Sequence, residues 1–212
     1  LFLARIEDLA TSAQKYQRVM STAFLDPAMV KKAESILKKY GELAYQIIGG
    51  YAEAERNIIL IYPDWMSIDG RVDAPISVLC IRWDERYYSI GHRDILGSIL
   101  GLGIKREKIG DIIVENHHAY VIAYKDISDY IIQNLIKAGK APVNIDEIAI
   151  QDLKVTVKKG KIIKTTVSSL RLDCIASSGF GMSRNKIVPY IRSEMIQVNW
   201  EPVAKPDYIL KE

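Results

Sequence analysis

Cysteine and histidine are scarce in this sequence, which holds two cysteines and three histidines among its 212 residues. Cys80 and Cys174 lie singly in apolar stretches, so neither has the closely spaced partner that a zinc site or a disulfide framework requires. We expect both to be buried free thiols in a reducing compartment. His117 and His118 are neighbours in an expected strand turn, where their side chains point in different directions and chelate poorly. The sequence therefore predicts no metal site.

Long apolar runs and nucleotide-binding motifs are also missing. No run approaches the roughly 18 apolar residues of a membrane-spanning helix, and the start has no secretory signal pattern, so we expect no membrane partner and a cytoplasmic location. The chain has no P-loop and no G-x-G-x-x-G motif, so we expect no bound cofactor. Leu1 is not an initiator methionine and the last residues break off within a pattern, so we expect both ends to be trimmed.

The charge is modest in sum but uneven along the chain. The formal net charge is +3, yet nine lysines and arginines lie between residues 154 and 192, with Asp173 as the one acid there. A local excess of this size indicates either a contact surface for a polyanion such as RNA or a solvated basic face.

Residues 1–72 are expected to form a helical N-terminal region with one short strand. Apolar residues recur at helical spacing between residues 9 and 20. Asp26 followed by Pro27 is the pattern of a helix cap and first turn, so a second helix should begin there. The apolar run at 57–62 predicts a buried strand.

Residues 73–152 are expected to form a domain of order β-α-β-β-α-β. Strand patterns at 76–83, 111–115, 119–124 and 142–150 alternate with helical patterns at 91–102 and 127–137. This split βαβ, or ferredoxin-like, order is shared by many RNA-recognition domains, although their aromatic RNP signature is absent here. The expected fold class is α+β with an RRM-like middle domain, and such a fold by itself indicates no function.

A basic hairpin is expected at the start of the last region, residues 153–212. Alternating apolar residues at 153–167 flank a turn that holds Lys158, Lys159 and Lys161. Three lysines at a hairpin tip cannot lie in a core, so they either solubilise the protein or face phosphates.

Two short helices should follow this hairpin. The first covers residues 170–177 and ends at Gly179. Ser183 is expected to cap the second helix, which places Arg184 and Lys186 in its first turns. A helix N-terminus beside two cations that point the same way is a favourable site for a phosphate.

Five short motifs follow one another over the last 45 residues, namely Arg171-Leu172-Asp173, Ser183-Arg184, Ile191-Arg192, Val198-Asn199 and Pro206. In order and spacing they resemble the S-four RNA-binding domain, also called the alpha-L motif. The family pattern has a glycine after the second helix, where this chain has Glu194. Pro189 falls inside that helix and should kink or shorten it. The pattern's closing Gly-Asp and final strand are absent from this sequence, so we expect the domain to be truncated.

Residues 91–114 read GHRDILGSILGLGIKREKIGDIIV. This stretch resembles the signature of the YlmH family, bacterial proteins in which an S-four domain closes the chain, and the likeness extends over nearly the whole sequence. The resemblance implies an N-terminal region at 1–72, an RNA-binding middle domain at 73–152 and the S-four domain at 153–212. It also implies association with the ribosome. Stand-alone S-four relatives bind the large subunit when peptidyl-tRNA is stranded on it, so a role in ribosome rescue or translation quality control is expected.

The expected function is therefore binding of structured RNA, either ribosomal RNA or a tRNA on the large subunit, by a monomer and without catalysis. Asp173 should pair with a neighbouring arginine, and Tyr190 either stacks on a base or sugar or simply packs. The residues expected to contact RNA are Arg171, Ser183, Arg184, Lys186, Tyr190, Arg192, Asn199, Lys158, Lys159 and Lys161.

A second RNA contact is predicted in the middle domain, at His92, Arg93, Lys105, Arg106 and Lys108. The alternatives are a structural role for His92 and an ordinary charged loop for the residues around Glu107.

The rival interpretation is an RNA-modifying enzyme, of the pseudouridine synthase or methyltransferase type, that uses the S-four module for targeting. Such enzymes need a nucleophilic Asp or a glycine-rich cofactor loop, and neither is recognisable in the first 150 residues. The pair of His92 and Asp94 is accompanied by no nucleophile motif.

Overall fold

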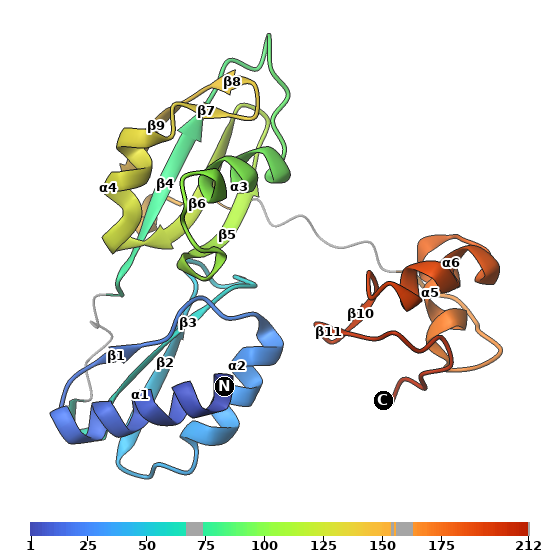
Figure 1. The fold of residues 1–212 in the computed structure, drawn as a ribbon, viewed down its shortest axis with the longest axis horizontal. Helices are drawn as coiled ribbons and strands as arrows, with labels where there is room; N and C mark the ends of the chain where they lie inside the picture. Colours follow the sequence, from blue (N-terminus) through green and yellow to red (C-terminus); the bar gives the residue numbers. More distant parts are fainter. Residues whose placement is uncertain (67–73, 154, 156–162, 212) are drawn as a thin grey trace. The chain divides into compact units, whose positions relative to one another are not determined.

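The chain folds into two units of mixed helix and sheet, which confirms the α+β class (Figure 1). The computed structural model describes residues 1–66, 74–153, 155 and 163–211. The first unit is Leu1–Thr156 and the second is Val157–Glu212. None of the described helices is both long and apolar enough to cross a membrane.

The N-terminal part of the first unit packs two helices on a three-stranded antiparallel sheet of order β1-β3-β2. Its elements are α1 (Phe2–Tyr16), β1 (Met20–Ser21), α2 (Pro27–Leu37), β2 (Leu43–Ile48), β3 (Ile58–Pro63) and a 3-10 turn η1 (Asp64–Met66). As predicted, Asp26 caps α2, because its carboxylate accepts the Met29 N–H at 2.8 Å. The expectation of a mainly helical region with one strand is wrong, because β2 and β1 flank the predicted strand.

The second part of the unit is a four-stranded sheet of order β5-β6-β4-β9, in which all neighbours are antiparallel. Its elements are β4 (Ile76–Arg82), α3 (His92–Gly101), η2 (Arg106–Lys108), β5 (Ile109–Val114), β6 (His118–Tyr124), α4 (Lys125–Asn134), β7 (Lys137–Ala138), β8 (Ala141–Pro142), β9 (Asn144–Ile148) and η3 (Ile150–Asp152). This is the predicted split βαβ arrangement, with a small β7–β8 hairpin that the sequence did not indicate.

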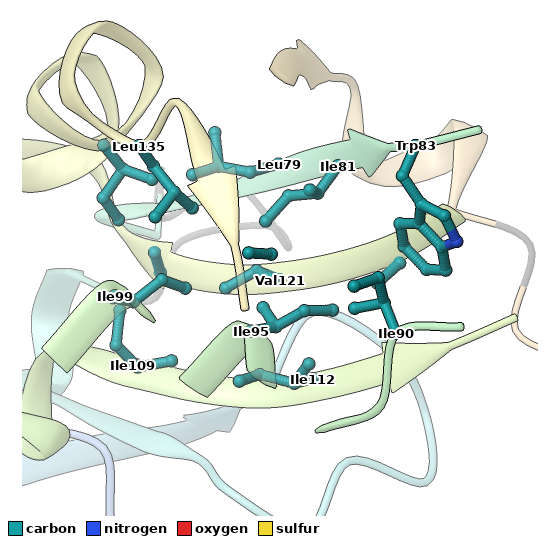
Figure 2. Close-up of a cluster of buried hydrophobic side chains, with 14 of the residues drawn as sticks. Leu79, Ile81, Trp83, Ile90, Ile95, Ile99, Ile109, Ile112, Val121 and Leu135 are labelled. Atoms are coloured by element: carbon teal, nitrogen blue, oxygen red, sulfur yellow. The ribbon is translucent and has the colours of Figure 1, made fainter. Parts of the chain in front are cut away.

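Helices α3 and α4 cover one face of the four-stranded sheet. Figure 2 shows Ile95 and Ile99 of α3 directed toward Val121, with Ile109 and other sheet residues around them. Ile95, Ile99 and Val121 are fully buried. Asp94 holds the start of α3, because its carboxylate accepts the Gly91 N–H at 2.9 Å.

The opposite face of this sheet is covered by the N-terminal part. Val78 and Ile122 of the four-stranded sheet share one apolar cluster with Ile58 and Leu60 of β3. Phe24 joins the cluster and meets the Tyr124 ring edge-on, with 5.5 Å between centroids. The face through which RRM domains stack RNA bases is therefore largely closed by the protein itself.

The second unit contains α5 (Leu172–Phe180), α6 (Arg184–Arg192) and a two-stranded hairpin of β10 (Gln197–Val198) and β11 (Glu201–Pro202). Helix α5 ends at Gly181, which is left-handed at φ 62°, and not at Gly179 as predicted. Its small core contains Leu172, Ala176, Ile187, Ile191 and Ile196.

Three other expectations are settled in part by the structure. The tip of the predicted basic hairpin lies outside the described residues, but its returning strand, at 163–167, is not a strand. Helix α6 runs through Pro189 to Arg192, so proline does not end it. Cys80 and Cys174 are buried and unbridged, as predicted.

Gly110 of β5 marks a close approach within the first unit. A Cβ atom there would lie 2.7 Å from the Phe24 ring. We expect Gly110→Ala to lower the free energy of unfolding by about 1–3 kcal/mol, because Phe24 would have to leave the shared apolar cluster. Urea denaturation measures this change. The matched control is Gly97→Ala in α3, where no heavy atom lies within 4 Å of the added Cβ; it should raise stability by about 0.5–1 kcal/mol. Equal effects of the two substitutions would contradict this packing.

Candidate nucleic-acid interface

A buried carboxylate organises the cationic end of the second unit. The Asp173 side chain is 5% exposed and lies in the first turn of α5. Arg184 donates from Nη2 to its Oδ2 at 2.5 Å, and Arg171 donates from Nε to its Oδ1 at 3.2 Å. We call these three residues the arginine–aspartate cluster. The expectation that Asp173 pairs with a neighbouring arginine is confirmed.

The charged state of Asp173 follows from this arrangement. Burial alone would raise its pKa, but hydrogen bonds from Arg184 and then from Arg171 outweigh it and lower the pKa to about 2. The positive end of the α5 dipole adds to the preference for a carboxylate at this position. Asp173 is therefore ionised at neutral pH and fixes both arginines.

The C-terminal segment completes the start of α5. The Asp173 N–H donates to the Pro206 carbonyl at 2.9 Å, and the Leu172 N–H donates to the Tyr208 carbonyl at 2.7 Å. These bonds satisfy two of the free N–H groups that begin a helix. They also explain why the sequence pattern links Arg171-Leu172-Asp173 with Pro206.

Both arginines stay accessible although they are paired. The side chains of Arg171 and Arg184 are 42% and 52% exposed. A guanidinium carries five N–H donors in a planar fork, and Asp173 occupies only some of them. The remaining donors can reach a phosphate in solvent, from positions that the buried carboxylate holds in place.

Helix α6 presents its cations on two flanks and not on one face. With about 100° between successive residues, Arg184 and Arg192 fall on one side of the helix, while Lys186 falls with Tyr190 on the other. The expectation that Arg184 and Lys186 point the same way is therefore wrong. Lys186 and Arg192 are exposed, and neither has an ion-pair partner in the part of the chain that the structure describes.

Two further residues of the resemblance have backbone roles. Ser183 precedes α6 in the N-cap position, but its side chain makes no capping hydrogen bond. Asn199 and Trp200 form the two-residue turn between β10 and β11 with φ values of 50° and 69°. Such a turn favours Asn at its first position, so backbone geometry accounts for Asn199.

The structure adds Trp200 to the candidates, because its side chain is 42% exposed at the hairpin tip. An exposed aromatic ring there is available to stack on a base or ribose. The sequence signal that could have found it is an aromatic residue directly after Asn199, inside a tight turn.

Glu194 stands in the left-handed region at φ 59°. The S-four pattern that this stretch resembles has glycine at this position, which adopts that conformation freely. Glutamate in place of glycine therefore strains the turn that follows α6, but the helix itself is intact. Lys158, Lys159 and Lys161, the predicted hairpin cations, lie outside the described residues.

The second predicted contact does not form one patch. His92 and Arg93 are exposed at the start of α3, whereas Lys105, Arg106 and Lys108 follow its end. A ten-residue helix separates the two groups by about 15 Å. The second RNA contact therefore remains a prediction for two groups of residues at opposite ends of α3.

The three cations after α3 differ in their exposure and in the contacts that their side chains make within the protein. Lys105 is exposed. Lys108 binds Asp126 at 2.6 Å and lies 4.5 Å from the Tyr124 ring centroid. Arg106 is partly buried and donates to the Ile109 and Gly110 carbonyls at 2.5 and 3.2 Å. Of these three, Lys105 is the most exposed, and Lys108 keeps 37% of its side chain exposed beside its ion pair.

Comparison with known proteins agrees with this architecture. A family model described as "YlmH, N-terminal" matches residues 2–65, and one described as "Putative RNA-binding domain in YlmH" matches residues 71–152. A relative from Bacillus subtilis (strain 168), named ribosome-associated protein quality control protein P2, is 32% identical over 199 residues, covering 94% of this chain and 77% of the relative. A solved structure, cell division protein ylmH from Streptococcus pneumoniae, is 26% identical with a TM-score of 0.60, covering 71% of this chain and 91% of that one.

The Asp173 ion pairs should make the second unit sensitive to acid. Because the folded-state pKa lies near 2, below the unfolded value of about 3.9, the carboxylate stabilises the fold above that value and loses this effect as pH falls toward 2. We expect Asp173→Asn to lower stability by about 1–2 kcal/mol at pH 7, a range reduced for the solvent exposure of the two arginines. Hydrogen exchange of the α5 amides at pH 7 and near pH 2.5 measures both effects.

The matched control is Asp207→Asn, which changes an exposed acid of the same unit. It should leave α5 exchange unchanged. A penalty for Asp173→Asn that stays the same down to pH 2 would contradict the ion-pair explanation.

Proposed function

The chain belongs to the YlmH family, and on that premise we propose that it binds structured RNA on the large ribosomal subunit in translation quality control. The relative from Bacillus subtilis supports the ribosomal context through its name, and one matched family model supports RNA as the ligand. Residues 153–212 act as the S-four module in this proposal. The RNA is ribosomal RNA, or a tRNA held on that subunit.

The observation that carries the proposal is the arginine–aspartate cluster, which joins the start of α5 to the start of α6. Its buried carboxylate fixes two guanidinium groups whose outer edges remain exposed. Preorganised arginines lose less side-chain entropy on binding than free ones, and their planar forks match the geometry of phosphate oxygens. Lys186 and Arg192 extend the positive charge along both flanks of α6.

Recognition in this proposal depends on the shape of the RNA more than on its sequence. Phosphate contacts position a protein on RNA but carry no base information. Trp200 and Tyr190, both 42% exposed, supply aromatic surfaces that accept any base. The ligand is therefore a folded RNA with an accessible loop or groove.

No catalytic step is part of the proposal. The names of the related proteins describe ribosome association and cell division and assign no reaction. No observation favours the rival RNA-modifying enzyme. The protein would work as a monomer in the cytoplasm, where ribosomes carry out translation.

A ribosome sedimentation profile tests the proposal. We expect Arg184→Ala combined with Lys186→Ala to reduce co-migration with the large subunit by tenfold or more, because about two phosphate contacts would be lost. The dependence of log affinity on log salt should also become shallower by about 0.7–0.9 for each phosphate contact removed.

Lys39→Ala removes an exposed cation from the first unit and is the matched control. It should leave co-migration and the salt slope unchanged. Undiminished co-migration of the Arg184 and Lys186 double variant would refute the S-four face as the ribosome contact.

A further inference from the structure

The first unit contains a cavity that the proposed ribosome contact does not use. It has a volume of about 390 Å³ and lies between the start of α1, the loop that leads into α2, and the η2 turn. Its walls include Phe2, Ala23 and Arg106 from these segments, and Arg56 from the loop before β3. We call it the Arg56–Arg106 cavity. Its size falls within the roughly 300–1,000 Å³ of typical small-ligand sites.

Positive charge dominates the polar wall of this cavity. Arg5, Arg56, Lys105 and Arg106 line it, against the acids Asp26 and Glu107. The Asp26 carboxylate is already engaged, because it accepts the Met29 N–H that begins α2. Arg5 and Lys105 are exposed at the rim.

Hydrogen bonds to backbone carbonyls hold Arg56 and Arg106 firmly, and the Asp111 carboxylate attracts both of them at longer range. Arg56 donates from Nε to the Ile109 carbonyl at 3.2 Å and from Nη2 to the Phe24 carbonyl at 2.9 Å. Arg106 binds the same Ile109 carbonyl through Nη1. Within the described ranges neither guanidinium forms an ion pair, and Arg56 Nη1 and Arg106 Nε and Nη2 have no hydrogen-bond partner.

The two guanidinium groups also repel one another. Burial, and then the positive charge of Arg56, lower the pKa of Arg106 to about 10. Two partly buried like charges that share a carbonyl are stabilised by an anion placed between their unused donors.

The rest of the wall is apolar. Phe2, Ile6, Leu9 and Phe24 line the cavity beside the cations. A ligand that fits both surfaces carries an anionic group for the guanidinium donors and a flat apolar body for this wall. A nucleotide has that composition, with a phosphate at one end and a base at the other.

We propose that the Arg56–Arg106 cavity binds a single nucleotide splayed out of a bound RNA, with its phosphate at the cations and its base on the apolar wall. The inference rests on the proposed RNA-binding function. It gives the first unit an RNA contact of its own, although its four-stranded sheet face is covered. Extruded bases held in pockets are a common way to recognise single-stranded RNA segments.

Mononucleotide binding to the full chain tests this inference. NMR chemical-shift titrations would use AMP and UMP as probes, with adenosine and inorganic phosphate as partial ligands. We expect the monophosphates to bind at least tenfold more tightly than adenosine or phosphate alone, and to shift the amides of Ala23 and Arg106. Arg5→Ala combined with Lys105→Ala should weaken AMP binding by tenfold or more, because both rim cations are exposed and their loss leaves the fold intact.

A second variant, Ala23→Leu, narrows the cavity without touching a charge and should also weaken AMP binding by tenfold or more. Lys39→Ala and Lys186→Ala are the matched cation controls and should leave AMP binding unchanged. Equal affinity for phosphate and AMP would refute the nucleotide site, as would AMP binding that survives both cavity variants or no mononucleotide binding at millimolar concentration.

The sedimentation profile separates this inference from the proposed function. If large-subunit co-migration depends on α6 but AMP does not bind, only the cavity assignment fails. If AMP binding depends on the cavity but the chain does not co-migrate with the large subunit, the ribosomal function fails and the cavity remains a nucleotide site.

Discussion

The second unit depends on one carboxylate whose pKa burial alone would raise. Asp173 stays ionised because Arg184 and Arg171 both donate to it, and because it lies at the start of α5. The same contacts fix the arginines with their outer edges in solvent. In the proposed function these three side chains would have two roles, because the contacts that fix the start of α5 would also set the spacing of the charges offered to a ribose-phosphate chain.

The first unit has a familiar fold with one face of its sheet covered by the protein itself. Its β5-β6-β4-β9 sheet has the RRM-like order, yet β3 and Phe24 cover the face on which RRM domains stack bases. Any RNA contact by this unit must therefore come from its loops and rims. Lys105 and the Arg56–Arg106 cavity lie at such a rim, where η2 meets the N-terminal helices. We infer that RNA would be recognised at the rim of this unit, because the N-terminal part covers the sheet face. The RRM-like fold itself is unchanged.

Local patterns in the sequence were sufficient for much of the fold. The middle strands and helices follow from clear periodicity, and the caps at Asp26 and Asp94 follow from short-range hydrogen bonds. Strand β2 escaped prediction because its burial pattern does not alternate clearly. Residue roles that depend on partners distant in the sequence could not be predicted either. Nothing near Arg106 in the sequence indicates that it lies beside Arg56. The side of α6 on which Lys186 lies could be assigned only once the bounds of the helix were known.

The central claim is that the α5–α6 face of the second unit is the ribosome contact. Hydrogen exchange of the full chain, free and bound to purified large subunits, tests it most directly. The account predicts slower exchange on binding at the amides of α6 and of the Asn199–Trp200 turn. Slower exchange confined to the first unit, or none in either unit, would contradict it.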